Sequence, residues 1–146
     1  MSSYARRIVL EAACGLVATY ASLRIAGFRR WKAAIEWLNP VSPDGSPACG
    51  QPEIEFAHAV ANWEAAAARH LPLTTNCLDR SITLWWLLRR RGVAADLRLG
   101  GRKENGRFEA HAWVEVEGAV VDQMGSDRNE FVPFESRVIA TETRVP

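Results

Sequence analysis

Three residues far apart in the chain carry side chains that together are suited to nucleophilic catalysis: Cys77, His111 and Asp122. A thiolate is the reactive form of cysteine, a histidine can take and return its proton, and a carboxylate can orient the histidine. Cys77 follows Thr74-Thr75-Asn76, which is typical N-cap chemistry for a helix. At the start of a helix, unpaired backbone N–H groups and the helix dipole favour a negative charge. The sequence therefore predicts a cysteine nucleophile at position 77.

His111 lies in the segment Glu109–Glu115 (EAHAWVE), which alternates in the manner of a strand. Alternation places His111 and Trp113 on one face of that strand. The alanines on both sides of His111 leave room for another element to approach, and Trp113 would shelter the imidazole from water. A strand histidine without a catalytic role fits the same pattern when taken alone. The preceding helix-start cysteine favours the interpretation of His111 as its base.

Asp122 is placed by the predicted register of a hairpin. If Glu117-Gly118 is a two-residue turn, Trp113 lies opposite Asp122 and His111 lies opposite Met124. Asp122 then shares a face with His111, one diagonal step away at about 7–8 Å between α-carbons. A carboxylate at that position can hold one imidazole nitrogen and orient the other. The weaker substitutes for this carboxylate are Asp79, Glu115 and Asp127.

Three nearby residues are candidates for supporting roles. The oxyanion of an acyl-transfer reaction needs hydrogen-bond donors, and Asn76 is a candidate beside the backbone N–H of Cys77, against its competing role as an N-cap. Arg80 and Trp113 are candidates to line the site, and Arg80 is expected either to pair with Asp122 or to touch substrate. The cysteines and histidines form no closely spaced ligand pair, so neither a metal nor another cofactor is expected.

The elements that position these residues come in two blocks. The first block has few helix breakers outside one proline-rich segment, residues 39–52, which is expected to be a surface loop. The expected helices are Tyr4–Ala26, Phe28–Leu38, Glu53–His70 and Cys77–Arg91.

After Gly92 the hydrophobic period changes from helical to two. Asn105-Gly106 is a strong hairpin signal between two alternating segments. The expected strands are Ala95–Leu99, Phe108–Val116, Ala119–Asp122 and an additional edge strand over Arg137–Val145. We therefore predict an α+β fold, with N-terminal helices followed by an antiparallel sheet packed on the Cys77 helix.

Length and composition limit the possible classes. The 146 residues are enough for one domain, with a helical part over 1–70 and the catalytic helix and strands over 71–146. A net charge of +1 gives no basic face for nucleic acid. Glu11 and Arg24 interrupt the apolar N-terminal stretch, so no membrane-spanning helix is expected. Three cysteines, an odd and sparse number, fit a reducing compartment, and we expect a cytoplasmic protein.

The order of helix-start cysteine, strand histidine and next-strand aspartate is typical of papain-like and transglutaminase-like enzymes. Three segments also match a narrower pattern: Cys77–Ser81 (CLDRS), Leu84–Gly92 (LWWLLRRRG) and Ala110–Glu115 (AHAWVE). Together they resemble the leader peptidase of lasso-peptide biosynthesis, the standalone cysteine-protease half of the lasso B protein in the transglutaminase-like superfamily. The resemblance is dense up to about Asp122, whereas residues 1–70 are similar only in being helical.

This resemblance implies that Cys77, His111 and Asp122 are catalytic, and that the chain removes the leader from a lasso-peptide precursor. It further implies two protein partners, a separate PqqD-like leader-recognition protein and an asparagine-synthetase-like lasso cyclase. Two alternatives remain open. One is an acyltransferase or amidase on the same fold, and the other is a non-catalytic scaffold that links the leader-binding protein to the cyclase.

Overall fold

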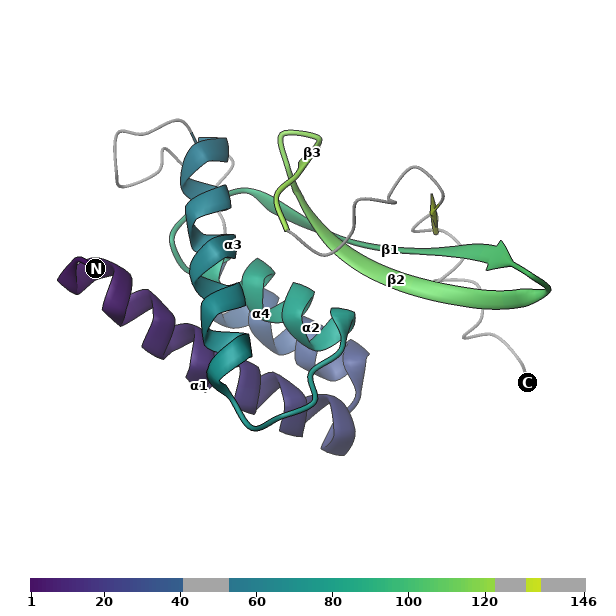
Figure 1. Cartoon of the computed structure of the whole chain (residues 1–146), viewed down its shortest axis with the longest axis horizontal. Helices are drawn as coiled ribbons and strands as arrows, with labels where there is room; N and C mark the ends of the chain where they lie inside the picture. The colour runs from purple at the N-terminus through teal and green to yellow at the C-terminus, as the bar shows by residue number, and fades with distance from the viewer. Residues whose placement is uncertain (41–52, 123–130, 135–146) are drawn as a thin grey trace.

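The fold is α+β in the computed structural model, which describes residues 1–40, 53–122 and 131–134. Its helices are α1 (Ser3–Ile25), α2 (Phe28–Leu38), α3 (Glu53–His70) and α4 (Cys77–Arg89). Its strands are β1 (Ala95–Glu104), β2 (Arg107–Val116), β3 (Ala119–Val120) and β4 (Val132–Pro133), and they form one antiparallel sheet in the order β3-β2-β1-β4. Figure 1 shows the helices gathered at one end and the β1–β2 hairpin extending away from them. The predicted α+β class, with helices before an antiparallel sheet, is confirmed.

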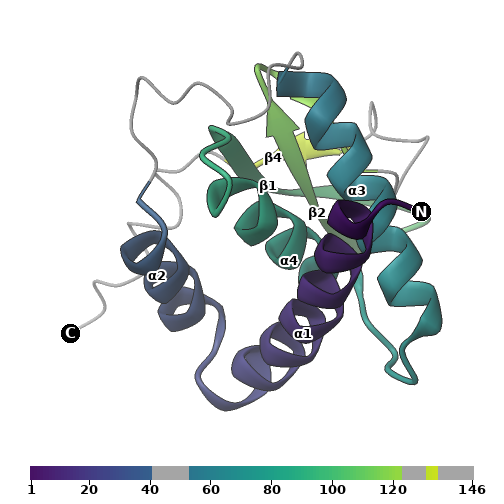
Figure 2. The same cartoon turned by 90° about the vertical axis from the view of Figure 1, so that its left-hand side faces the viewer.

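Helix α4 is at the centre of the packing. It contacts α1, α3, β1 and β2, and Figure 2 shows it between α1 and the sheet. A helix that is buried around most of its circumference has its position set by its neighbours. Cys77, in its first turn, is therefore fixed by the core of the whole domain. The residues of α4 that are almost completely buried are Ile82, Thr83, Leu84, Trp85, Leu87 and Leu88.

Helix α1 packs against α3 and α4 through the buried side chains of Ile8, Ala12 and Leu16. Gly15 allows the close approach to α4, because a Cβ atom there would lie 2.8 Å from Cζ3 of Trp86. A larger residue at position 15 would therefore separate the two helices.

Helix α1 is also long and apolar enough to cross a membrane, with a mean hydropathy of 1.5 over its most apolar window, 28% of which is buried in the fold. The core helix of a soluble protein and an N-terminal signal sequence share these properties. In this fold the buried side of α1 serves as one wall of the helical core.

Both predicted tight turns are present. The φ angles are 49° and 77° in Asn105-Gly106, and 52° and 76° in Glu117-Gly118. Two successive residues in this left-handed region are characteristic of type I′ hairpin turns. Val116 pairs with Ala119 across the second turn. The register used to place Asp122 is therefore correct up to the end of β3.

The ends of β1 and α4 differ from the predicted boundaries. Strand β1 continues beyond Leu99 to Glu104, because Gly100 and Gly101 remain paired with β2 instead of ending the strand. Helix α4 ends at Arg89 instead of Arg91, just before Gly92 adopts a φ of 78° and turns the chain.

Strand β3 ends at Val120, so the prediction that it reaches Asp122 is wrong. Strand β4 was not predicted, because two residues that include a proline carry no alternating pattern. It pairs with Gly100 and Gly101 on the other edge of the hairpin. The predicted strand over Arg137–Val145 and most of the predicted loop over 39–52 lie outside the described residues.

Candidate active site

Cys77 is the first residue of α4, and its half-buried thiol lies beside a fully formed helix cap. Asn76 Oδ1 accepts the backbone N–H of Asp79 at 2.9 Å, and Asp79 Oδ2 accepts the N–H of Asn76 at 3.0 Å. This capping box fixes the chain on both sides of the thiol. The described residues offer no acceptor to the N–H groups of Cys77 and Leu78, which are thus available to a negatively charged group.

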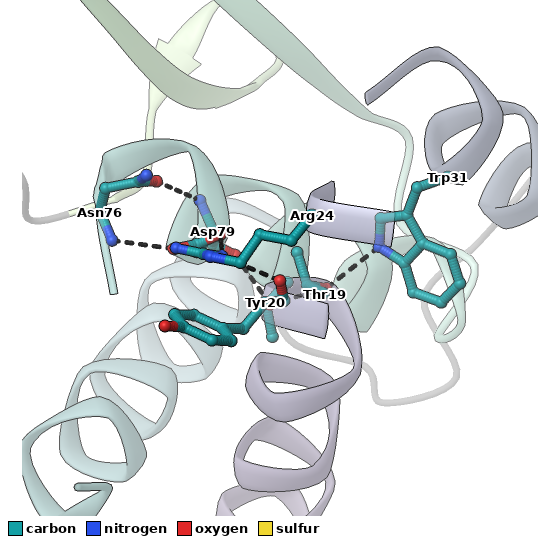
Figure 3. A network of polar contacts seen from close by, with 7 residues as sticks. Thr19, Tyr20, Arg24, Trp31, Asn76 and Asp79 are labelled. Atoms are coloured by element: carbon teal, nitrogen blue, oxygen red, sulfur yellow. Dashed lines mark hydrogen bonds and ion pairs between the residues drawn. The ribbon is translucent and has the colours of Figure 1, made fainter. Parts of the chain in front are cut away.

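Arg24, near the end of α1, reaches across to this cap. Its Nη1 lies 3.5 Å from Oδ1 of Asp79, a carboxylate with no exposed side-chain surface. The same nitrogen donates to the carbonyl of Tyr20 at 2.8 Å, and the guanidinium Cζ lies 3.4 Å from the centre of the Tyr20 ring. Figure 3 shows Arg24 between Tyr20 and the Asn76–Asp79 cap. Helix α1 therefore supplies the counter-charge of the carboxylate that caps α4.

A second series of hydrogen bonds supports the junction between α1 and the start of α4. Thr83 Oγ1 donates to the carbonyl of Asp79 at 2.8 Å and lies 3.2 Å from Oγ1 of Thr19 on α1. Trp31 of α2 donates its ring N–H to the same Thr19 hydroxyl at 3.2 Å, as Figure 3 shows. The first turn of α4 is thus tied to both N-terminal helices.

Ser81 connects α4 to the sheet. Its hydroxyl oxygen lies 2.9 Å from the carbonyl of Ala112 and 3.3 Å from Oδ2 of Asp122, so it can donate to either. Cys77 is four residues before Ser81 and therefore lies on the same helix face, one turn away, at a rise of about 6 Å. Ser81 thus joins the helix that begins at Cys77 to β2, the strand that carries His111.

The carboxylate of Asp122 explains why β3 is short. Asp122 Oδ2 accepts the backbone N–H of Val114 at 3.2 Å, whereas the neighbouring Val121 N–H still donates to the Val114 carbonyl at 3.0 Å. A side-chain oxygen therefore takes the place that a backbone carbonyl would occupy in a longer ladder. As a result, Asp122 lies at the uncovered edge of β2, within reach of Ser81.

His111 lies in β2 between two aromatic rings. Its ring centre is 6.1 Å from that of Trp113, with planes 19° apart, and 4.9 Å from that of Phe131. Within the described part of the chain, His111 is hydrogen bonded to neither Cys77 nor Asp122. Catalytic hydrogen bonds are often long in unliganded enzymes and shorten when substrate is bound.

Trp113 is held in place by its neighbours on the sheet. Its ring N–H donates to Oε1 of Glu115 at 2.9 Å, and the ring lies over Gly100 of β1. A Cβ atom at Gly100 would come within 2.7 Å of both the Trp113 ring and the carbonyl of Val132. This glycine is thus required for the tryptophan to lie flat beside His111.

Arg80 does not pair with Asp122, the first of its two expected partners. Its Nε and Nη2 donate to the two carboxylate oxygens of Glu64 on α3, at 3.2 and 3.0 Å. Burial raises the pKa of the Glu64 carboxyl, and the nearby charge of Asp122 adds to this effect, while Arg80 opposes it. The carboxylates of Glu64 and Asp122 therefore lie close together at the junction of α3, α4 and the end of β3, and Arg80 neutralises part of their charge.

Sequence reasoning missed Glu64, although a signal was present. Glu64 is four residues after Val60 and seven after Ala57, so it lies on the buried face of an otherwise alanine-rich helix. A lone charge on such a face requires a partner. Ser81 was missed as well, although it lies one helical turn after Cys77.

The weaker substitutes for Asp122 have other contacts. Asp79 caps α4, and Glu115 binds the Trp113 ring N–H and also pairs with Arg98 at 3.2 Å. Asp127 lies outside the described residues.

The residues that the structure describes contain no group of three or more potential metal ligands. A cavity of about 450 Å³ lies between α2 and β1 and is lined by residues such as Lys32, Leu97 and Phe134. None of the candidate catalytic residues lines this cavity, so the chemistry of the site is not located there.

The fold and the site together define a class: an α+β domain with a cysteine at a capped helix N-terminus, packed against a sheet that carries a histidine in β2 and is followed by an aspartate just beyond β3. The chain belongs to the transglutaminase-like superfamily, whose sequence profile matches residues 15–136. This superfamily includes cysteine peptidases and acyltransferases, and its domain is typically a cysteine-protease-like catalytic fold. No curated protein matches the chain, and no solved structure does.

Replacement of Ser81 tests the link between α4 and Asp122. We expect Ser81→Ala to lower the free energy of unfolding by about 1–3 kcal/mol, because the buried contact of the hydroxyl with the Ala112 carbonyl is lost and Asp122 Oδ2 keeps only the Val114 N–H. In urea unfolding, its cost should be non-additive with that of Asp122→Ala, by about 0.5–3 kcal/mol. Strictly additive costs would show that the two residues are not linked. Ser3→Ala, at the exposed start of α1, is the matched control and should have little effect.

Glu64 should make stability depend on pH. A carboxyl whose pKa is raised in the folded state contributes stability that is present below its unfolded pKa and is lost as pH rises through the folded pKa. Glu64→Gln should therefore flatten the fall in unfolding free energy as pH rises above the ordinary pKa of a glutamate carboxyl. An unchanged slope in urea unfolding would contradict the assignment.

Glu11 on α1 serves as a control, because its pKa shifts in the opposite direction from that of Glu64. Burial alone would raise the pKa of its carboxyl, but hydrogen bonds and charges from Arg91, Arg7 and Arg90 outweigh burial and lower it. The stability that the Glu11 carboxyl contributes is present above its pKa in the unfolded state and is lost as pH falls through its pKa in the folded state. Glu11→Gln should therefore lower the unfolding free energy at neutral pH and flatten its fall toward acid pH, without changing the slope on the neutral side, in urea unfolding at several pH values.

Proposed function

We propose that this chain is a cysteine peptidase that removes the leader from a lasso-peptide precursor, with Cys77, His111 and Asp122 as its catalytic residues. The observation that carries the proposal is the contact of Ser81 with both Ala112 and Asp122. This contact joins α4, which begins at Cys77, to β2, which carries His111, and so supports their proposed cooperation. The resemblance of the CLDRS, LWWLLRRRG and AHAWVE segments to lasso leader peptidases supplies the substrate class.

In this mechanism His111 takes the proton of Cys77, and the thiolate attacks the carbonyl carbon of the peptide bond between leader and core. The electron pair of the carbonyl moves to oxygen, and the backbone N–H of Cys77 stabilises that oxyanion. His111 then protonates the departing amine of the core peptide as the C–N bond breaks. Water, deprotonated by His111, hydrolyses the remaining thioester and releases the leader with a free carboxylate.

Asp122 would hold the imidazole in the required orientation and stabilise its protonated form. Its fixed position at the edge of β2 supports this role. Oδ1 of Asn76 accepts a hydrogen bond in the helix cap, and the amide nitrogen of the same side chain is the candidate second donor to the oxyanion. Trp113, whose ring lies beside that of His111, would limit the access of water to the imidazole.

The partners in this proposal are the precursor's leader peptide, a separate PqqD-like leader-recognition protein and an asparagine-synthetase-like cyclase. The net charge of +1 supports the view that nucleic acid is not a partner. Cys14 and Cys77 are free thiols, which supports a reducing, cytoplasmic setting without a membrane partner.

An acyltransferase or amidase of the same fold would use the same three residues, with an amine in place of water as acceptor. The family match is compatible with either reaction. A non-catalytic scaffold would hold the leader-binding protein and the cyclase together without using Cys77 at all.

Mass spectrometry of a lasso precursor incubated with this protein and the leader-recognition partner tests the proposal. We expect a free leader carrying a C-terminal carboxylate, formed by the wild type and lost in Cys77→Ala by at least about 1,000-fold, since the nucleophile is absent. Cys14→Ala, which removes the exposed cysteine of α1, is the matched control and should retain full activity. Leader release by Cys77→Ala would refute the proposal, and a leader joined to an added amine would support the acyltransferase.

A further inference from the structure

Asp79 presents an electrostatic problem for a catalytic thiol. Its carboxylate has no exposed surface and lies in the first turn of α4, two residues after Cys77. An uncompensated negative charge at that distance opposes the formation of a thiolate. The carboxylate is nevertheless needed, because it accepts the N–H of Asn76 and completes the cap.

Arg24 supplies the compensation. Its guanidinium, at 3.5 Å, makes the ion pair that the described residues provide for Asp79. The position of Arg24 is set independently of Asp79, because it stacks on the Tyr20 ring and donates to the Tyr20 carbonyl. Figure 3 shows the side chain extended along this path, from α1 toward the start of α4. Thus α1 itself holds the positive charge of Arg24 in place.

We infer that Arg24 is a positioning residue that acts through Asp79 to keep the Cys77 thiolate accessible at neutral pH. It neutralises the buried capping carboxylate, so that the N–H groups at the start of α4 favour the charge on sulfur. This inference rests on the proposed role of Cys77 as nucleophile. It gives a specific function to the end of α1, which is far from Cys77 in sequence.

The other charged or titratable groups near the first turn of α4 come from different elements. They are Glu64 and Arg80, which pair with each other, and Asp122 after β3, which Ser81 contacts; His111 is in the strand β2 whose Ala112 carbonyl Ser81 also contacts. None of them contacts Arg24 or Asp79 among the described residues, and all are left unchanged in the test below. Tyr20, the remaining titratable neighbour, is on α1 and holds Arg24.

The test measures the rate at which iodoacetamide alkylates Cys77 as a function of pH, in a Cys14→Ala, Cys49→Ala background where Cys77 is the single thiol. We expect Arg24→Ala to slow alkylation near pH 6–7 by about three- to tenfold, which is a shift of about half to one pH unit. Arg24→Lys keeps the charge and should stay within about twofold of the parent. The control Arg7→Ala removes an exposed arginine from the same helix and should leave the profile unchanged.

The double variant separates the proposed role from a general loss of structure. Asp79→Asn removes the negative charge but keeps an oxygen that can accept the Asn76 N–H. If Arg24 acts through Asp79, Arg24→Ala should have little effect on alkylation in the Asp79→Asn background. Equal slowing in both backgrounds, or no slowing in either, would overturn the inference.

The alkylation assay needs no substrate or partner, so its outcome is independent of leader release. If Cys77→Ala still releases the leader, the proposed function fails even when Arg24 changes the alkylation profile. If leader release requires Cys77 but alkylation is insensitive to Arg24, only the positioning role fails.

Discussion

The cap at the N-terminus of α4 is the interaction on which the rest of the site depends. A buried helix start leaves backbone N–H groups that need partners, and Asn76 and Asp79 satisfy them reciprocally on both sides of Cys77. The cap includes a buried carboxylate, which in turn requires a cation. Arg24 of α1 meets that requirement, so the packing of the N-terminal helix and the local environment of the thiol are parts of one arrangement.

From this fixed start, α4 connects the helical layer to the sheet. Ser81, one turn beyond Cys77, reaches Ala112 and Asp122, and Asp122 ends β3 by taking the N–H of Val114. Among the described residues, β3 pairs with β2 only as far as Glu115, so this ladder ends before it reaches His111. The candidate site therefore lies beyond the point where a short strand stops.

Much of this organisation was predictable from the sequence, because it follows from local patterns. The helices, the Asn105-Gly106 turn and the register across Glu117-Gly118 depend on periodicity and turn chemistry; the structure confirms the turn and the register, and the helix ends to within two residues. The partners of Arg80 and Asp122 were not predictable, because they are set by packing between helices and strands distant in sequence. No spacing rule joins Glu64 to Arg80 or Arg24 to Asp79; only the packing of α3 and α1 on α4 does.

The relation between Cys77 and His111 is the central claim, and the pH dependence of Cys77 alkylation in wild type and in His111→Ala measures it most directly. With Cys77 as the single thiol, the wild type should react readily below about pH 7, where an ordinary cysteine is mostly protonated. His111→Ala should react at least about tenfold more slowly there and approach the wild-type rate only at alkaline pH. Superimposable profiles for the two proteins would contradict the pairing of this histidine with this thiol.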